Sequence, residues 1–310
     1  MIQFNNLPKN IDVQRYNATD GVTWETWDKP FGCTTAYIVC IGGGGGAGAG
    51  SYSSGSTSAG YGGGNGAASA FTIAQVPFYF IPDTMYVRVG LGGIPGTPNS
   101  TSGGQGVNGG SGGFSYVSFY PSTSMADCLV TNSLSAAPGG ISPSAGSTGG
   151  PPAGPSALVN SASGNPLYLS LCNWTSYPGN GGSFPVTNNT APTNSTICGT
   201  TILAAGAGGG GNSSSAPTTG GSVVSSDSLV SFFTNIPANA VNGIANNGYG
   251  SIKPFFFTGG PGGTSGRGAV SGAGGNGAPG CGGGGSGAGA GATPSNGGYG
   301  GNGLVIIISF

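Results

Sequence analysis

Few side chains in this sequence have the chemistry that acid–base or nucleophilic catalysis requires. There is no histidine, which removes Ser-His-Asp and Cys-His catalysis, histidine metal ligands and the commonest general base. Carboxylates could form the pair used in glycoside hydrolysis, but the seven present are scattered along the chain. They are Asp12, Asp20, Glu25, Asp28, Asp83, Asp127 and Asp227. We therefore expect no enzyme, no catalytic residue, no cofactor and no metal site; a carbohydrate-active enzyme is the remotest alternative.

A glycine pattern after an apolar run raises the question of a dinucleotide site. Residues 41–48 contain the G-x-G-x-x-G spacing, which in a Rossmann unit opens a helix and precedes an acidic residue by about 20 positions. Here Ser-Tyr-Ser-Ser-Gly follows at 51–55, and the next acidic residue is Asp83. Because the chain contains 70 glycines, the spacing is expected by chance and we do not interpret it as a nucleotide site.

The cysteines lack the spacing of a metal or redox motif. They are Cys33, Cys40, Cys128, Cys172, Cys198 and Cys281. The first residues show no signal-peptide pattern of basic and apolar regions. We therefore expect most of these thiols to be reduced and buried, in preference to a disulfide framework.

Aromatic residues within polar or glycine-rich stretches are the best candidates for contacts with a receptor or partner. They are Tyr52, Tyr61, Trp174, Tyr177, Tyr249, Phe255, Phe256 and Phe257. Aromatic rings flanked by Asn and Ser suit sugar faces or protein partners. The alternative, which the composition favours, is that these rings fill seams between packed glycine segments.

The overall composition points to a folded, uncharged protein that belongs in an assembly. Gly and Pro number 70 and 22 of 310 residues, at the level that normally signals disorder. Disorder, however, requires low hydrophobicity and high net charge, whereas here the net charge is −1 and 36% of residues are hydrophobic. Six basic residues are too few to form a positively charged surface for nucleic acid. No run of apolar residues reaches the length of a membrane-spanning helix. We expect a homo-oligomer, with a trimer favoured, and no membrane insertion.

Short extended segments alternate with glycine tracts. Strands are predicted at 35–41, 85–89, 114–120, 167–171 and 304–310 from β-branched and aromatic runs. The last run is continuously apolar, which is typical of a strand buried on both faces. Almost no α-helix is expected.

The glycine tracts lie at about 42–66, 90–113, 139–154, 206–221 and 259–303. A flexible linker is the usual interpretation of such composition. These tracts recur between strands, however, and carry almost no charge. We expect them to form extended helices with three residues per turn that bond to one another through backbone groups.

An ordered set of elements resembles the glycine-rich domains of phage tail proteins. Residues 24–32 contain the Trp-x-x-Pro-x-Gly opening, which is followed by a strand and the glycines at 42–46. Residues 87–93 resemble the central strand and glycine turn, 109–115 the Gly-Gly-x-Ser element, and 300–306 the closing segment. Some members of this family resemble the tip adhesins of long tail fibres.

The resemblance covers about 24–310 and implies an all-β fold. We expect short strands in a sandwich or jelly-roll-like arrangement with packed polyglycine-II helices. Residues 1–30 are expected to form an N-terminal attachment segment, and 31–310 the glycine-rich domain. Within that domain 121–205, rich in Ser, Asn and Pro, is expected to be an insertion or a set of long loops.

The resemblance also implies a function. We expect a virion structural protein of a phage tail tip or fibre that contributes to host attachment, made in the host cytoplasm without a signal peptide. Its partners would be other virion proteins and a host-surface glycan or protein. The alternative is a surface or minor capsid protein of a larger virus.

Overall fold

The computed structural model describes residues 11–55, 60–133, 136–143, 173–179, 195–197, 203–211, 217–225, 247–248, 250–252 and 255–310. These residues form an all-β protein, as predicted, with 3-10 turns at Phe78–Phe80 and Met125–Asp127. The first eight strands are β1 (Asp12–Asn17), β2 (Glu25–Asp28), β3 (Thr35–Ile41), β4 (Tyr52–Ser53), β5 (Phe71–Pro77), β6 (Thr84–Arg88), β7 (Tyr116–Ser118) and β8 (Cys128–Thr131). The others are β9 (Asn173–Tyr177), β10 (Ser195–Ile197), β11 (Val223–Ser225), β12 (Gly250–Ile252), β13 (Phe255–Phe257), β14 (Gly266–Arg267), β15 (Gly289–Ala290) and β16 (Leu304–Ser309).

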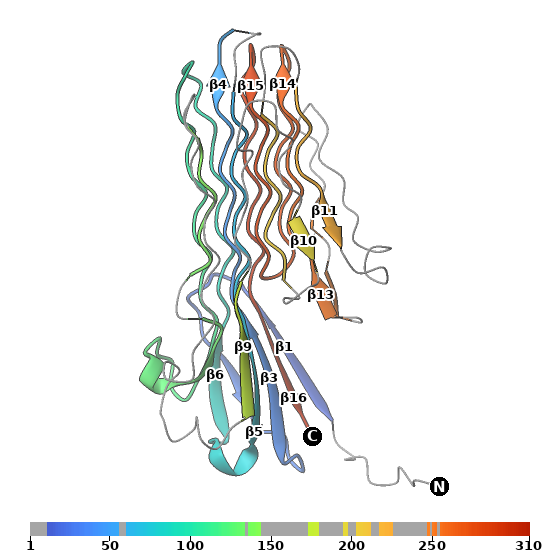
Figure 1. Ribbon diagram of the computed structural model, residues 1–310. Coiled ribbons are helices and arrows are strands. Elements are labelled where there is room, and N and C mark those ends of the chain that lie inside the picture. Colours follow the sequence, from blue (N-terminus) through green and yellow to red (C-terminus); the bar gives the residue numbers. More distant parts are fainter. Residues whose placement is uncertain are drawn as a thin grey trace, which may run out of the picture.

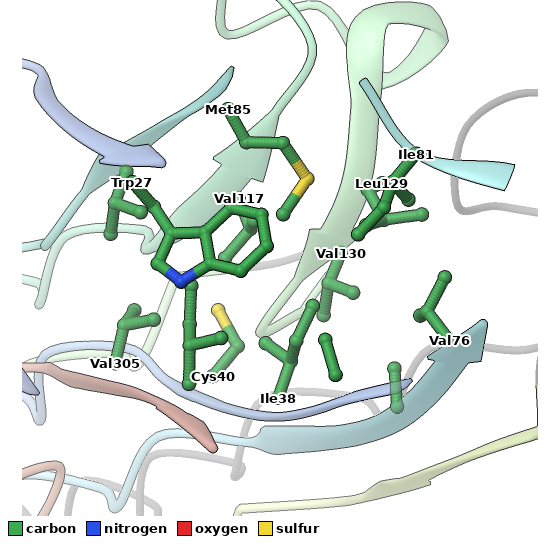
Figure 2. Packing of buried hydrophobic residues seen from close by; sticks show 14 of the residues in the cluster. Trp27, Ile38, Cys40, Val76, Ile81, Met85, Val117, Leu129, Val130 and Val305 are labelled. Carbon is green, nitrogen blue, oxygen red and sulfur yellow. The ribbon is translucent and has the colours of Figure 1, made fainter. Parts of the chain in front are cut away.

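Two antiparallel sheets form a sandwich at one end of the molecule. The larger sheet has the order β1-β16-β3-β5-β9, and the smaller has the order β2-β6-β7-β8. Strand alternation directs one side of each sheet into a shared core. Trp27 from β2 is completely buried there against Met85, Val117 and Cys40 (Figure 2).

Strand β16 is buried on both faces, as its continuous apolar sequence predicts. Val305 and Ile307 lie in the core between the sheets. Leu304 and Ile306 lie on the outer face, in a second cluster with Leu203, Phe257, Ala278 and Cys281 at the base of the glycine-rich part. Strand β3 lies beside β16 in the same sheet and pairs with it antiparallel.

Above the sandwich, the glycine tracts run side by side as long undulating segments (Figure 1). Their backbone hydrogen bonds repeat every three residues. Gly43 and Gly46 donate to the carbonyls of Gly113 and Gly110, at 2.8 and 2.9 Å. The same segment donates to two further neighbours, from Gly44 to Gly301 and from Gly45 to Ala67.

Three successive residues thus bond to three different neighbouring segments, and the fourth returns to the first. This is the threefold repeat of polyglycine-II packing. Segment 43–51 also accepts hydrogen bonds from segments 93–96, 140 and 283–289, so its backbone is bonded on all sides. Segment 281–288 has the same environment, donating to 204–210 and 272–275 and accepting from 260–266. We refer to these packed segments as the glycine lattice. It satisfies backbone groups that no regular sheet or helix satisfies.

Glycine is required in the lattice because the segments approach each other backbone to backbone. A Cβ atom on Gly44 would overlap the carbonyl of Cys281, and one on Gly283 would overlap the carbonyl of Gly298. Alanines such as Ala47 and Ala207 occur where the lattice has room, and both are buried. The tracts are therefore packed elements of the fold and not linkers.

Two segments that the sequence analysis sets apart contribute strands to the sandwich. Strands β1 and β2, within the expected N-terminal segment 1–30, belong to the two sheets. The expected insertion at 121–205 supplies β8 and β9 to these sheets, and its residues 138–141 bond to the lattice. The strand expected at 167–171 lies outside the described residues.

Three cysteines behave as expected. Cys40, Cys128 and Cys281 are buried thiols that form no disulfide. Burial raises the pKa of Cys128 to about 11 and that of Cys281 to about 12, because a thiolate is poorly solvated there. Cys172 and Cys198 lie outside the described residues.

Candidate binding surfaces at the two ends of the molecule

The sandwich end presents strongly exposed aromatic side chains. Phe31 is 97% exposed in the β2–β3 turn, Tyr79 is 92% exposed in the 3-10 turn after β5, and Tyr120 is 66% exposed after β7. The β2–β3 turn is tight because Gly32 has a φ of 84°, a conformation that L side chains rarely adopt. We call these three side chains, together with Phe80, the aromatic end.

Two hollows flank Tyr79. One, of about 540 Å³, is lined by Tyr79, Phe80, Phe119 and Tyr120 together with Asp127. The other, of about 530 Å³, lies between Phe31 and Tyr79 and is floored by Pro77 and Phe78. Exposed apolar surface of this kind marks interaction sites on soluble proteins.

A lysine fixes the turn that carries Tyr79. The Nζ atom of Lys29 donates hydrogen bonds to the carbonyls of Phe78 (3.1 Å) and Ile81 (2.8 Å). It also forms an ion pair of 3.1 Å with Asp83, whose side chain is 97% exposed. Lys29 and Asp83 thus neutralise each other, and Asp127 is the remaining charged residue among those that line the two hollows.

The opposite end of the molecule is formed by turns of the glycine lattice. Strands β14, β15 and β4 form a small parallel sheet there (Figure 1). Turns at Gly103, Gly268 and Gly291 have positive φ angles of 77°, 66° and 72°. Open space surrounds Gly103 and Gly268. We call this region the lattice tip; among the residues described there, Arg267 carries the only charge.

The glycine-rich domain family matches residues 18–309. The chain belongs to this family. A search of curated proteins finds no match to the chain.

Within this glycine-rich domain, the predicted contact residues do not form one site. Tyr52 lies in β4 at the lattice tip and is half-buried. Tyr61 is half-buried beside Ser51, which donates its backbone N–H to the Tyr61 carbonyl (2.9 Å). Tyr177 lies in β9 on the sandwich, stacked on Phe71 with ring centroids 4.6 Å apart.

Phe257, one of the predicted contact residues, lies in the interior. It is 3% exposed and packs in the cluster on the outer face of β16, so it fills a seam, as the alternative interpretation holds. Trp174 in β9 and Phe255 and Phe256 in β13 are described only by their backbone pairing. Tyr249 lies outside the described residues.

The aromatic end of the glycine-rich domain escaped the sequence reasoning. Phe31 and Tyr79 lie outside the glycine-rich and the Asn- and Ser-rich stretches in which contact residues are expected from the sequence. The sequence feature that marks these rings is proline, which indicates turns. Pro30 precedes Phe31, and Pro77 and Pro82 lie on either side of the aromatic run at 78–80. Proline favours turns, and an aromatic ring in a turn is not held against the core as a strand residue is. Such rings are therefore good candidates for exposed contact residues.

Other chemistry has no counterpart in the described part of the glycine-rich domain. No group of three Cys, Asp or Glu side chains converges there as a metal site. The G-x-G-x-x-G spacing at 41–48 leads into the lattice and opens no helix. No described helix is long and apolar enough to cross a membrane.

Proposed function

We propose that this glycine-rich domain is a virion structural protein of a phage tail tip or fibre that contributes to host attachment. The observation that supports this function most is the glycine lattice between two different ends. A lattice in which every segment is hydrogen-bonded to its neighbours is a stiff spacer, and turns on a stiff scaffold are well suited to contact a target.

In this proposal the aromatic end binds the assembly. Interfaces are enriched in aromatic residues and depleted of charge at their centres, and the rings of Phe31, Tyr79 and Tyr120 fit that description. The partners would be other virion proteins and further copies of the chain, with a trimer favoured. The lattice tip would then point outward, toward a glycan or protein of the host surface.

The first experiment substitutes the aromatic end. Phe31→Ser and Tyr79→Ser should fold normally, because both rings are almost fully exposed, yet should reduce incorporation into particles at least tenfold. Tyr299→Ser, at a 55% exposed lattice position, is the matched control and should incorporate normally. Immunoblots of purified particles and sedimentation of the isolated protein provide the measurements.

Cryo-microscopy of the particle supplies the decisive test. The proposal expects density for the chain at a tail tip or fibre, with the aromatic end in contact with neighbouring proteins. Density on the capsid surface would favour the alternative, a surface or minor capsid protein of a larger virus. An aromatic end that faces solvent on the particle would contradict the assembly role.

A further inference from the structure

The outer face of the larger sheet is covered by the glycine lattice only over part of its area. Away from the lattice, Tyr37, Ile73 and Tyr177 are half-buried, whereas Gln75, Asn173 and Thr175 are exposed. These six residues line a hollow of about 210 Å³. The hollow is separate from both the aromatic end and the lattice tip.

Strand register brings these side chains together. Tyr37, Gln75 and Asn173 lie directly opposite one another on β3, β5 and β9. The next pair along the same face is Ile73 and Thr175. Since side chains of one face repeat every two residues, Ile73 forms an apolar floor beside a row of polar groups.

The walls of the hollow are held in place. Tyr177 is stacked on Phe71 with an interplanar angle of 12°. Strand β9 is paired with β5 along five residues, and the hydroxyls of Thr72 and Ser176 lie 2.8 Å apart on the other side of the sheet. The aromatic and amide groups are therefore presented by packed strands and not by loops.

The polar groups of the hollow are available for a ligand. In the described part of the chain, the side chains of Tyr37, Gln75, Asn173 and Thr175 have no hydrogen-bond partner. Amides and hydroxyls both donate and accept, as sugar hydroxyls do. None of the six lining residues is charged, and Arg15 on the same face is bonded to Asn17 (3.1 Å).

We propose that this hollow binds one neutral sugar ring, with the C–H face of the ring on Ile73 and the tyrosines and its hydroxyls bonded to Gln75, Asn173 and Thr175. The volume is below that of sites for drug-sized ligands, which suits a single ring or the end of a glycan. With no cation in the lining, a phosphate or an acidic sugar would lack a counter-charge. This site does not depend on the proposed function.

Saturation-transfer NMR on the full chain tests the site. The probes are glucose, galactose, mannose, N-acetylglucosamine and N-acetylgalactosamine, each alone at millimolar concentration, with glucuronic acid as the charged comparison. At least one neutral sugar should receive saturation at its ring C–H protons. Gln75→Ala and Asn173→Ala should each weaken its binding about three- to tenfold, the loss of one hydrogen bond, with unchanged melting.

The control is Thr26→Ala, an exposed polar residue on a strand of the other sheet, which should bind as the wild type does. Absence of saturation with every neutral sugar would overturn the proposal. So would binding that Gln75→Ala leaves unchanged, or glucuronic acid that binds as tightly as the neutral sugars. None of these results would bear on particle incorporation, so failure here is distinguishable from failure of the proposed function.

Discussion

At the scale of single residues, the lattice can form because glycine has no Cβ atom. The segments touch through backbone carbonyls, so the tolerance of a position depends on what its Cβ would meet. Adjacent glycines can differ completely in this respect. A Cβ on Gly109 would overlap the carbonyl of Gly46, whereas one on Gly110 would lie 2.9 Å from Cγ1 of Ile94, an exposed side chain.

This difference gives a matched pair of substitutions. Gly109→Ala should lower the free energy of unfolding by about 3 kcal/mol or more, at the upper end of overpacking costs, because backbone must move. Gly110→Ala should cost about 1 kcal/mol, because the exposed Ile94 side chain can rotate away and only the Ile94 backbone nitrogen, 3.2 Å from the new Cβ, remains close. Urea denaturation of both variants measures the difference. Equal stability would contradict a close-packed lattice and restore the flexible-linker interpretation; Gly44→Val and Gly283→Val should behave like Gly109→Ala.

Buried thiols make stability dependent on pH. The folded pKa of Cys281, about 12, lies above the unfolded value of about 8.5. The folded state therefore retains a proton that the unfolded state releases. Stability from this thiol is complete below about pH 8.5 and falls as pH rises toward 12, by about 1.4 kcal/mol per pH unit. Cys281→Ala should lower the slope of the urea midpoint against pH above pH 9, with the part due to the other buried thiols remaining; an unchanged slope would mean that the Cys281 thiol is accessible to water.

At the scale of elements, β16 connects the two hydrophobic clusters. Its pairing with β1 and β3 places it inside the larger sheet, next to the edge strand β1, and its two faces belong to different clusters. The lattice therefore packs on the sandwich through the outer face of this strand. Because both faces of β16 are packed, the neighbouring side chains can move little to fill the cavity left when one of its side chains is shortened.

Ile307→Ala should accordingly destabilise the protein by about 2–5 kcal/mol, because Ile307 is fully buried between the sheets. Ile308→Ala is the control, and its half-buried side chain on the outer face should make the loss less than about half as large. Deletion of 304–310 should abolish folding. A truncated chain that remains soluble with unchanged oligomer mass in sedimentation would show that the strand is peripheral.

At the scale of the whole molecule, the sandwich and the lattice are one folding unit. The chain passes between them repeatedly: lattice segment 42–51 follows β3, segment 61–70 precedes β5, and segment 90–113 joins β6 to β7. The cluster around Leu304 contains residues of both parts. Neither part can unfold without removing packing or loop closure from the other.

We therefore expect one cooperative unfolding transition. Calorimetric and van't Hoff enthalpies should agree, and tryptophan emission, which reports on buried Trp27 in the sandwich, should change together with far-ultraviolet circular dichroism. Gly109→Ala, although in the lattice, should shift both probes equally. Two separate transitions would mean that the lattice and the sandwich are independent domains.

The sequence alone determined the classes of element in this protein. A β-branched run gives β3 its bounds of 35–41, a continuous apolar run predicts the double burial of β16, and uncharged tracts of glycine predict threefold packing. These are local properties, since strand preference and the lack of a Cβ act within a few residues. The position of each tract among its neighbours could not be read in this way, because a glycine segment carries no side chain that specifies a partner.

Tertiary structure alone decided which residues belong to the sandwich and which rings reach solvent. β1 joins the sheet because it pairs with β16, nearly 300 residues further along the chain. Phe257 is buried and Phe31 exposed, although each lies in a short aromatic or proline-rich stretch. The hollow beside Tyr37 requires the register of three strands distant in sequence. Burial depends on what the rest of the chain places over a residue, and that is set by long-range packing and not by local sequence.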